Sequence, residues 1–303
     1  MIYLTDPTEF HHMAPTVVTI GKFDGVHRGH QVLMRRTIEL ARSSDDPRCA
    51  SVAVILDGSR RRILTRQERV AYLKTVGIDY VIEMPLSDEL KNQSAESFVN
   101  DFLLGTLHAE AVIVGEDFRF GKGRRGDVAM LKECGRELEF VTEEVMTVRD
   151  DGIRISSTEI RARLSEGNME KVNRYLGYSF FLSGTIVHGR HLGHTLGVPT
   201  TNLVPASDKL LPPNGVYASA VEIGGRTYHG MTNIGTRPTV SGIETGVETH
   251  LFDVEEDLYG KEEKVELLHY TRPEADYGSL EALKARLMKD KDEIRAWFAG
   301  NGY

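Results

Sequence analysis

The sequence contains very little cysteine and no long apolar run. Cys49 and Cys134 are the only cysteines among 303 residues, and they stand far apart and outside any Cys-x-x-Cys spacing. Two reduced thiols in a cytosolic protein are therefore expected, not a disulfide. No apolar stretch approaches the roughly 18–20 residues that a membrane-spanning helix needs. Residues 1–13 also lack the basic and apolar regions of a secretory signal. We expect a cytoplasmic protein without a membrane partner.

An excess of positive charge is also missing. The chain has 37 Lys and Arg residues against 45 Asp and Glu residues, which gives a formal net charge of −8. Non-specific binding to nucleic acid depends on a basic surface that neutralises phosphates, so we expect no nucleic-acid partner. A small anionic ligand needs only local donors, and basic side chains do gather at residues 60–62 and 119–125. Each cluster is either a solvated surface or part of a ligand site.

The first half of the chain alternates short β-branched runs with helical patterns. The predicted elements are strands at 17–20, 51–56, 80–84 and 111–115 and helices at 30–43, 65–76, 94–107, 157–166 and 169–176. Thr65 and Glu68 stand at capping-box spacing at the start of the second helix. Alternation of this kind predicts an α/β domain with a parallel sheet that is covered on both faces.

From about residue 180 the composition changes, and glycine and proline become frequent. Segments typical of antiparallel strands follow one another at 180–187, 215–223, 226–234, 247–253 and 263–270. They predict a small antiparallel barrel or sandwich, closed by a helix with Ser279 as its N-cap. The apolar face of that helix is expected to contain Leu280, Leu283, Leu287, Ile294 and Phe298. Since a domain typically has about 100–200 residues, we predict two domains, 1–179 and 180–303.

The stretch GKFDGVHRGH (21–30) combines flexible backbone with two imidazoles where a strand leads into a helix. In an open parallel sheet, ligands bind beyond the carboxyl ends of the strands. Gly21 and Gly25 allow tight turns, and His27 and His30 are three apart, so they share one face of the first helical turn. The free N–H groups of such a turn attract phosphate. At this point a metal-binding pair and two surface histidines remain alternatives to a phosphate site.

This stretch resembles the signature of the nucleotidyltransferase module in bacterial bifunctional riboflavin kinase/FAD synthetases. Two later segments, VGEDFRFGKGRRGD (114–127) and ISSTEIRARLSEGNMEKVNRYLG (155–177), are similar to further motifs of that family. The resemblance implies a Rossmann-like N-terminal domain that transfers AMP from ATP to FMN and releases pyrophosphate. The nucleotide-binding residues that it implies are Gly21, Phe23, Asp24, Gly25, His27, His30, Asp117, Ser156, Ser157, Thr158 and Arg161.

The implied chemistry explains the composition of the motif. The FMN phosphate is already an anionic nucleophile, so the site needs no protein base. It must align the reactants and stabilise charge at the α-phosphate and the departing pyrophosphate. His27 and His30 are the implied catalytic residues for that task.

A second motif lies in GRHLGHTLGVPTTNL (189–203). Its glycine spacing alone favours a glycine-rich surface loop. Together with the following PTTN it resembles the ATP-binding loop of riboflavin kinases, which implies a riboflavin kinase-like barrel. The implied nucleotide-binding residues are Gly189, Gly193, Gly197, Thr200 and Asn202. Thr200 and Asn202 are also the implied Mg²⁺ ligands, since hydroxyl and amide oxygens are hard donors.

Three later segments follow the riboflavin kinase pattern in order: GVYA (215–218), TNIGTRPTV (232–240) and VETHLFD (247–253). Glu248 matches the general base that would help the riboflavin 5′-hydroxyl attack the γ-phosphate. The implied flavin-binding residues are Asn233, Thr236 and Arg237.

One segment departs from the family pattern. Members usually carry a Phe-(Asp/Glu)-Pro-His-Pro-like loop after the second strand, whereas this chain has VILDGSRRRILT (54–65). Asp57 matches the acidic residue, but Arg60, Arg61 and Arg62 replace the rest. A grip on the FMN phosphate is one hypothesis for these arginines.

The resemblance covers about residues 15–298 and predicts a bifunctional enzyme. Riboflavin, FMN and ATP are its expected small-molecule substrates, FAD is its product and Mg²⁺ its cofactor. Two alternatives remain open. One is a riboflavin kinase with an impaired adenylyltransferase domain, and the other is a flavin-responsive regulatory or binding protein.

Overall fold

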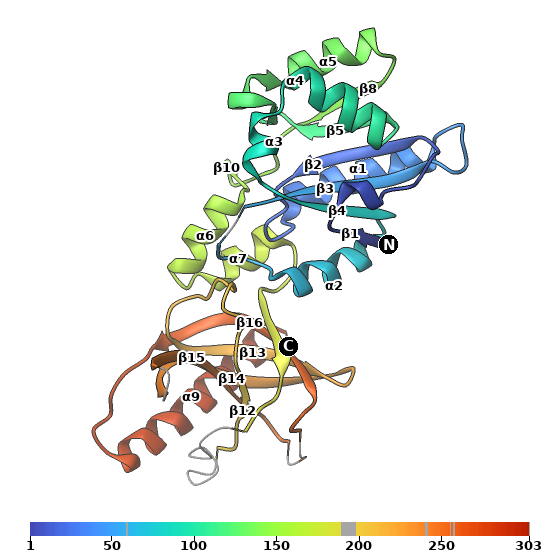
Figure 1. Ribbon diagram of the computed structural model, residues 1–303. Coiled ribbons are helices and arrows are strands. Elements are labelled where there is room, and N and C mark those ends of the chain that lie inside the picture. The colour runs from blue at the N-terminus through green and yellow to red at the C-terminus, as the bar shows by residue number, and fades with distance from the viewer. Residues whose placement is uncertain (59, 189–197, 240–241, 255, 257, 303) are drawn as a thin grey trace. The chain divides into compact units, whose positions relative to one another are not determined.

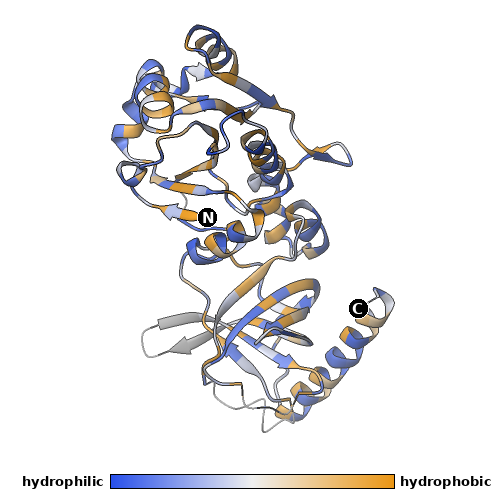
Figure 2. Ribbon diagram, turned by 90° about the vertical axis from the view of Figure 1, so that its right-hand side faces the viewer, coloured by the Kyte–Doolittle hydropathy of each residue, from blue (hydrophilic) through white to orange (hydrophobic). Residues whose placement is uncertain are grey.

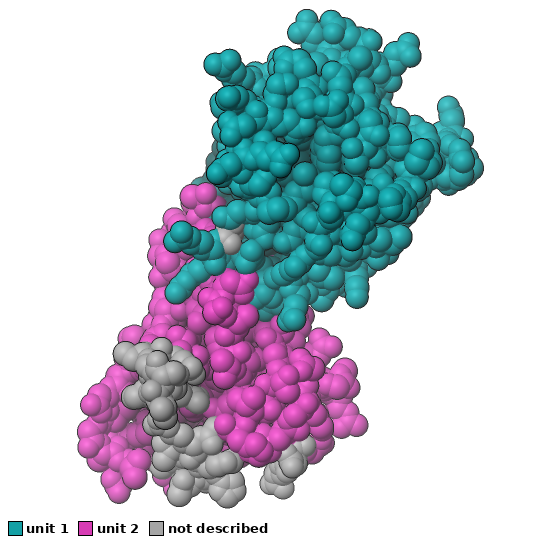
Figure 3. Space-filling model, viewed as in Figure 1, with its two compact units in different colours: residues 1–157 teal, residues 158–303 magenta. Residues whose placement is uncertain are grey.

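The computed structural model describes residues 1–58, 60–188, 198–239, 242–254, 256 and 258–302. The chain divides into two compact units, Met1–Ser157 and Thr158–Tyr303 (Figure 3). Each unit has its own sheet and its own hydrophobic core. Among the described residues, no helix is both long enough and apolar enough to cross a membrane.

Unit 1 is built on a six-stranded parallel sheet with the strand order β1-β4-β3-β2-β5-β8 (Figure 1). The strands are β1 (Ile2–Leu4), β2 (Thr16–Gly21), β3 (Ala50–Asp57), β4 (Tyr80–Pro85), β5 (Ala109–Gly115) and β8 (Val141–Val145). After β2 the chain first adds β3 and β4 on one side and then adds β5 and β8 on the other side. The strand order therefore reverses between β2 and β5, and the predicted α/β domain is confirmed.

Helices cover both faces of this sheet. Its helical elements are η1 (Pro7–Glu9), α1 (Arg28–Arg42), α2 (Arg66–Val76), α3 (Asp88–Asn92), α4 (Ala95–Ser97), the π-helix η2 (Phe98–Thr106), η3 (Lys122–Arg124) and α5 (Val128–Glu137). Val18 packs in one core cluster with Phe102 of η2, whereas the adjacent Val17 packs in another cluster with Ala41 of α1. Alternate strand residues point to opposite faces, so both faces of the sheet are buried. Apolar residues accordingly run along its strands (Figure 2).

Local signals account for most of unit 1. Thr65 accepts a hydrogen bond from the Glu68 backbone, and the Glu68 side chain accepts one from the Thr65 backbone, which confirms the capping box. The sequence patterns did not predict β1, α5 or β8. β1 has only three residues, and β8 is a partly exposed strand with two central glutamates, so neither has a strand-like apolar run. Two short hairpins complete the unit, β6 (Arg119–Phe120) with β7 (Gly126–Asp127) and β9 (Arg149–Asp150) with β10 (Ile153–Arg154).

Unit 2 contains a six-stranded antiparallel sheet with the order β11-β16-β13-β14-β15-β12. The strands are β11 (Phe181–Thr185), β12 (Thr201–Leu203), β13 (Gly215–Ile223), β14 (Arg226–Thr239), β15 (Gly242–Leu251) and β16 (Glu262–Pro273). Just beyond β11, the Val187 backbone N–H donates to the Asn202 carbonyl of β12 at 2.8 Å. The two edges of the sheet therefore approach each other, and the predicted antiparallel barrel is nearly closed. β12 was not predicted.

Two helices precede the barrel, α6 (Ser157–Ser165) and α7 (Met169–Leu176), close to their predicted ranges. The Asn173 side chain of α7 donates to the Leu267 carbonyl of β16 at 2.9 Å and accepts from the Phe180 backbone at 2.7 Å. These bonds join α7 to the sheet, and the compact unit begins at Thr158. The domain boundary at 179/180 stays a prediction.

The terminal helix α9 (Leu280–Gly300) covers one face of the barrel sheet. Ile294 and Phe298 belong to a core cluster that also contains Met231 of the sheet. Ser279 caps the helix as predicted, because its side chain accepts from the Ala282 backbone at 3.1 Å. Of the predicted apolar face, the sheet covers only the later part, since Leu280 is 61% exposed. It occupies the first helical position, ahead of the residues that reach the core cluster.

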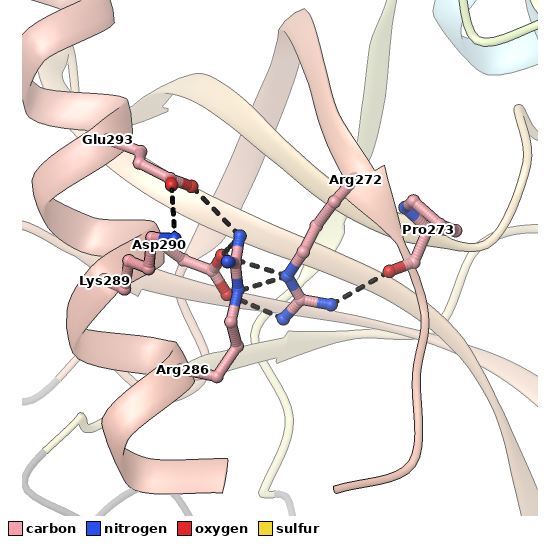
Figure 4. Close-up of polar contacts among 6 residues, drawn as sticks. All are labelled: Arg272, Pro273, Arg286, Lys289, Asp290 and Glu293. Atoms are coloured by element: carbon pink, nitrogen blue, oxygen red, sulfur yellow. Dashed lines mark hydrogen bonds and ion pairs between the residues drawn. The ribbon is translucent and has the colours of Figure 1, made fainter. Parts of the chain in front are cut away.

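A buried ionic cluster fastens α9 to β16 (Figure 4). Asp290 is fully buried and accepts hydrogen bonds from Arg272 Nε at 2.9 Å and Nη2 at 2.6 Å. Arg286, one helical turn before Asp290, approaches the same carboxylate at 2.6 Å and Glu293 at 2.9 Å. A buried carboxylate is tolerated only with such partners, so the cluster sets where the helix lies on the sheet.

Candidate active sites

The first candidate site lies at the carboxyl ends of β2 and β5, where the strand order reverses. Residues 22–27 connect β2 to α1, and Glu116 and Asp117 follow β5. Because β2 and β5 are parallel neighbours, the segments that follow them begin at the same edge of the sheet. The stretch GKFDGVHRGH therefore occupies the predicted strand-to-helix connection.

The turn after β2 depends on its glycine. Gly25 has a φ of +78°, and a Cβ atom there would lie 2.9 Å from Ile63 Cγ2. The carboxylate of the neighbouring Asp24 is buried, and its Oδ1 accepts from the Ile63 backbone N–H at 2.9 Å. These contacts hold the turn against the segment that follows β3. Nucleotide contacts by Gly25 and Asp24 stay predictions.

His27 and His30 form a stacked pair at the start of α1. Their ring centroids are 3.6 Å apart with an interplanar angle of 18°. The fully buried Phe23 packs its ring against His30 at 5.1 Å, and a Cβ atom on Gly21 would come within 3.2 Å of the Phe23 ring. The two histidines therefore share one face of the first turn, as predicted.

Both histidines are neutral near pH 7. Burial lowers the pKa of His27 to about 4. Burial, with the neighbouring His27, holds the pKa of His30 well below 6.5. Both Nδ1 atoms are buried and have no hydrogen-bond partner within the described part of the chain. An unpaired buried acceptor is less costly than an unpaired N–H, so we assign the ring proton to Nε2.

Asp117 lies beyond β5 and forms an ion pair with Arg154. Both side chains are exposed, so the pair can open toward a ligand. No group of three or more His, Cys, Asp or Glu residues that could hold a metal was found among the described residues. A third ligand of those types is thus not available to the histidine pair in the part of the chain that the structure places.

The predicted hydroxyl-rich motif lies at the start of α6. Ser157 donates its hydroxyl to the Asp24 carbonyl at 2.9 Å, which joins this motif to the turn after β2. Ser156 precedes it and is half-buried. Thr158 and Arg161 follow in the same helix but belong to unit 2. Their approach to the first site stays a prediction.

Charged side chains gather where β3 and β4 end. Arg62 Nη2 lies 2.7 Å from Asp57 Oδ2, and the buried Arg69 lies 3.0 Å from Glu83 and 3.7 Å from Asp57. Burial lowers the pKa of Arg69 and raises that of Glu83. The sequence reasoning missed Arg69 and Glu83. The only sequence signal for this charged group was Glu83, a glutamate inside the apolar run YVIEM. Arg62 is therefore engaged with Asp57, whereas Arg60 and Arg61 are exposed.

The second candidate site is a row of polar residues across three strands of unit 2. Asn202 of β12 pairs with Glu248 of β15, and Glu248 pairs with Asn233 of β14. Directly paired residues of neighbouring strands share one face of the sheet. The fold thus brings the predicted metal ligand, the predicted base and a predicted flavin-binding residue into one line.

The other predicted kinase residues lie around this row. Thr200 is half-buried and directly precedes β12. Thr236 is exposed, and Arg237 follows it in β14 in register with Glu244 of β15. Three predicted nucleotide-binding residues lie outside the described residues, namely Gly189, Gly193 and Gly197.

A cavity of about 100 Å³ opens beside the segment that leads into β12. It is lined by apolar residues that include Ile186, Leu251 and Leu258 and by Thr200 and Thr201. Glu256 also lines it, and its volume is well below the roughly 300–1,000 Å³ of a typical ligand pocket, so it does not by itself mark a ligand site.

The opposite face of the same strands carries buried hydroxyl groups that the sequence reasoning did not single out. The Thr232 hydroxyl lies 2.7 Å from that of Ser219 and 2.9 Å from that of Thr249. Thr201 donates to the buried Glu263 at 2.8 Å, and burial raises the pKa of Glu263 to about 7. Threonines at alternate positions in neighbouring strands were the available signal.

Both halves of the chain match known families. Residues 9–159 match the family model described as FAD synthetase, and residues 176–298 match the one described as riboflavin kinase. A crystal structure described as that of a macrolide-efflux protein from Streptococcus pneumoniae has a TM-score of 0.87 and 28% identity. The match covers 98% of this chain and 99% of the Streptococcus pneumoniae chain.

Curated relatives match over almost their whole length. The bifunctional riboflavin kinase/FMN adenylyltransferase of Escherichia coli K12 is 39% identical over 294 residues, which cover 93% of this chain and 92% of the relative. The enzyme of the same name from Pseudomonas fluorescens is 36% identical over 297 residues, which cover 95% and 94%. With both family models matched in order and relatives at 36–39% identity matched over more than nine tenths of the chain, the chain belongs to the family of bifunctional riboflavin kinase/FMN adenylyltransferases.

Proposed function

We propose that the chain divides the two reactions of its family between its two domains. The protein is an enzyme that phosphorylates riboflavin to FMN and adenylylates FMN to FAD, with ATP as co-substrate of both steps. We assign adenylyl transfer to domain 1–179 and phosphoryl transfer to domain 180–303. The observation that carries this assignment is that a stacked imidazole pair on a strand-to-helix turn forms one site, whereas a row with a central carboxylate forms the other.

In the first site, an oxygen of the FMN phosphate attacks the α-phosphorus of ATP, and the bond to the bridging oxygen of pyrophosphate breaks. No proton has to leave the nucleophile. His27 and His30 would donate their Nε2–H groups to phosphate oxygens as negative charge develops. Because both rings are already neutral and held by their stacking contact, they need little reorganisation at the moment of reaction. Gly21, Phe23 and Gly25 would shape the turn, and Asp117, Ser156, Ser157, Thr158 and Arg161 would contact the nucleotide.

In the second site, the 5′-hydroxyl oxygen of riboflavin attacks the γ-phosphorus of ATP. Glu248 would accept the hydroxyl proton while the bond to the β–γ bridging oxygen breaks and ADP leaves. Asn233, in register with Glu248, would help to hold the flavin, together with Thr236 and Arg237.

Magnesium fits the donor set of the second site. Thr200 offers a hydroxyl oxygen and Asn202 an amide oxygen, with the Glu248 carboxylate in register beside Asn202. Mg²⁺ prefers such hard oxygen donors and commonly takes only one or two ligands from the protein, the rest being phosphates and water. We propose Thr200 and Asn202 as its ligands. When bound, the ion would neutralise phosphate charge. We also propose a cytoplasmic location, on the grounds of the two unpaired thiols.

A two-part incubation tests this proposal. Wild-type protein is incubated with riboflavin and Mg·ATP, and in parallel with FMN and Mg·ATP, and the flavins are separated by chromatography. We expect FMN followed by FAD in the first mixture and FAD in the second. FMN without FAD in both mixtures would identify an impaired adenylyltransferase. No product in either would identify a flavin-binding protein and overturn the proposal.

A further inference from the structure

The segment that carries Thr200 and Asn202 is held in place by the residues before Thr200 and by Thr201, which lies between the two. Val198 is buried in the core cluster that α9 covers. The Pro199 carbonyl lies 2.9 Å from His250 Nδ1. Thr201 donates its hydroxyl to Glu263 on the other face of the strand. The proposed metal ligands therefore stand between fixed points.

The bond from His250 is a directional one. A carbonyl only accepts, so Nδ1 of His250 must carry the proton. The ring is 5% exposed and packs edge-on against Phe252 at 5.7 Å. Burial lowers the pKa of His250, so the ring is neutral near pH 7. Nε2 is buried and has no hydrogen-bond partner within the described part of the chain, so the polar contact of this ring is the one to Pro199.

His250 also lies on the functional face of its strand. It follows Glu248 by two residues in β15, and residues two apart in a strand point to the same side. One strand thus places the proposed base with one side chain and supports the proposed metal-binding segment with another.

We propose that His250 is a positioning residue of the phosphoryl-transfer site. Its Nδ1–H holds the Pro199 carbonyl and thereby sets where Thr200 and Asn202 meet Mg·ATP. This inference rests on the proposed kinase function. It assigns no contact between His250 and a substrate.

The environment of Pro199 allows the positioning role of His250 to be distinguished from a contribution to folding stability. Pro199 as a residue is exposed and its bond to His250 is only partly buried, so water has access to this region when the donor is lost. Removal of the donor should therefore cost little folding stability at that bond. It should instead free the segment to shift, and displacements of about 1 Å can cost roughly 10²-fold in rate.

The test compares four variants. His250→Asn keeps an N–H donor near the Nδ1 position, His250→Gln offers one near the Nε2 position, and His250→Leu has none. His229→Leu removes another histidine of the same sheet, which stacks on Phe298 at 4.2 Å and has no place in the proposed site. Binding of Mg·ADP and of riboflavin is measured by calorimetry, together with the KM for ATP, kcat for FMN and the thermal unfolding midpoint.

We expect His250→Leu and His250→Gln to weaken Mg·ADP binding by about 10-fold or more, as is typical for residues that support metal ligands. Riboflavin binding should be unchanged, His250→Asn should recover most of the affinity, and His229→Leu should bind Mg·ADP like the wild type. If His250→Leu does not fold, the Asn and Gln variants still decide the question.

Two results would overturn the inference. One is equal Mg·ADP affinity of the Asn and Gln variants. The other is a loss of riboflavin binding and thermal stability that parallels the loss of Mg·ADP binding. A wild-type protein that forms no FMN would overturn the kinase assignment itself. Wild-type FMN formation combined with unchanged Mg·ADP binding in His250→Leu would overturn only the role of His250.

Discussion

The two candidate sites are built from different parts of the backbone. The first is centred on the turn after a buried parallel strand, where six of its eleven predicted nucleotide-binding residues fall within ten consecutive residues; the other five lie at 117 and 156–161. The second lies across three antiparallel strands, and Asn202, Asn233 and Glu248 come together only through strand register. The first site thus has a compact local motif at its centre, whereas the row of the second site is assembled by strand register.

The chemistry of the two nucleophiles accounts for much of this difference. A phosphate nucleophile carries its charge already, so donors on a glycine-rich turn and a helix N-terminus are sufficient. A primary alcohol must lose a proton, so the proposed second site requires a carboxylate beside the hydroxyl. Strands hold such a constellation more rigidly than a loop does.

The largest effect is expected from substitution of the proposed base, Glu248. Glu248→Gln keeps the size of the side chain but cannot accept the hydroxyl proton, so FMN formation should fall by about 10²–10⁴-fold. FAD formation from supplied FMN should stay at the wild-type level. Glu222→Gln, at an exposed position of β13, is the matched control. Equal loss of both products in Glu248→Gln would show that the sites are not separate.

A substitution in the buried ionic cluster tests whether unit 2 can unfold independently of unit 1. Asp290→Ala leaves Arg272 and Arg286 without their carboxylate and should destabilise unit 2 by about 3–5 kcal/mol, as breaking a buried ion pair does. Thermal unfolding should show an earlier loss of kinase activity than of adenylyl transfer. Asp292→Ala, at an exposed position of the same helix, should leave the unfolding midpoint unchanged. Parallel loss of both activities would contradict this.

Substitution of the histidine pair should have the opposite selectivity to substitution of Glu248. His27→Ala combined with His30→Ala removes both donors and should lower FAD formation from FMN by about 10²–10³-fold, the usual cost of losing preorganised charge stabilisation. FMN formation should persist. His11→Ala changes an exposed histidine and controls for general effects. Undiminished FAD formation in the double variant would remove the pair from the mechanism.

The arginine-rich loop offers a smaller test within the first site. Arg60→Ala with Arg61→Ala should raise the KM for FMN about tenfold if these side chains hold its phosphate. Arg62 is left in place because it is paired with Asp57. Arg35→Ala, exposed on α1, is the control. An unchanged FMN affinity would refute the hypothesis for Arg60 and Arg61.

The smallest expected effect is on pH dependence. Because the pKa of His27 is lowered to about 4 in the folded protein, the rate of adenylyl transfer should change less than about twofold between pH 6 and 8 through this residue. In the unfolded chain the same histidine binds a proton near pH 6.5. The stability of unit 1 should therefore fall as the pH drops from about 6.5 to 4. His27→Gln should flatten that fall in a thermal unfolding series, and an equally steep fall would contradict the assignment.

Much of the fold could be predicted because its signals are local. The capping box at Thr65, the β-branched runs of the parallel strands and the cap at Ser279 depend on neighbouring residues only. β8 escaped prediction because a partly exposed edge strand carries no continuous apolar run. The exposure of Leu280 could not be predicted, because helical periodicity identifies a face but not how much of its length the sheet covers.

The sequence by itself indicated the two reactions, because the motifs around His27, Asn202 and Glu248 follow the order of the family that the chain resembles. Only the tertiary structure decided the protonation state, the alignment and the support of these residues. Burial makes His27 and His30 neutral, register aligns Asn202 with Glu248, and His250 reaches the Pro199 carbonyl across 51 residues of sequence. Desolvation and strand pairing depend on contacts between distant segments, and no pattern of adjacent residues contains them.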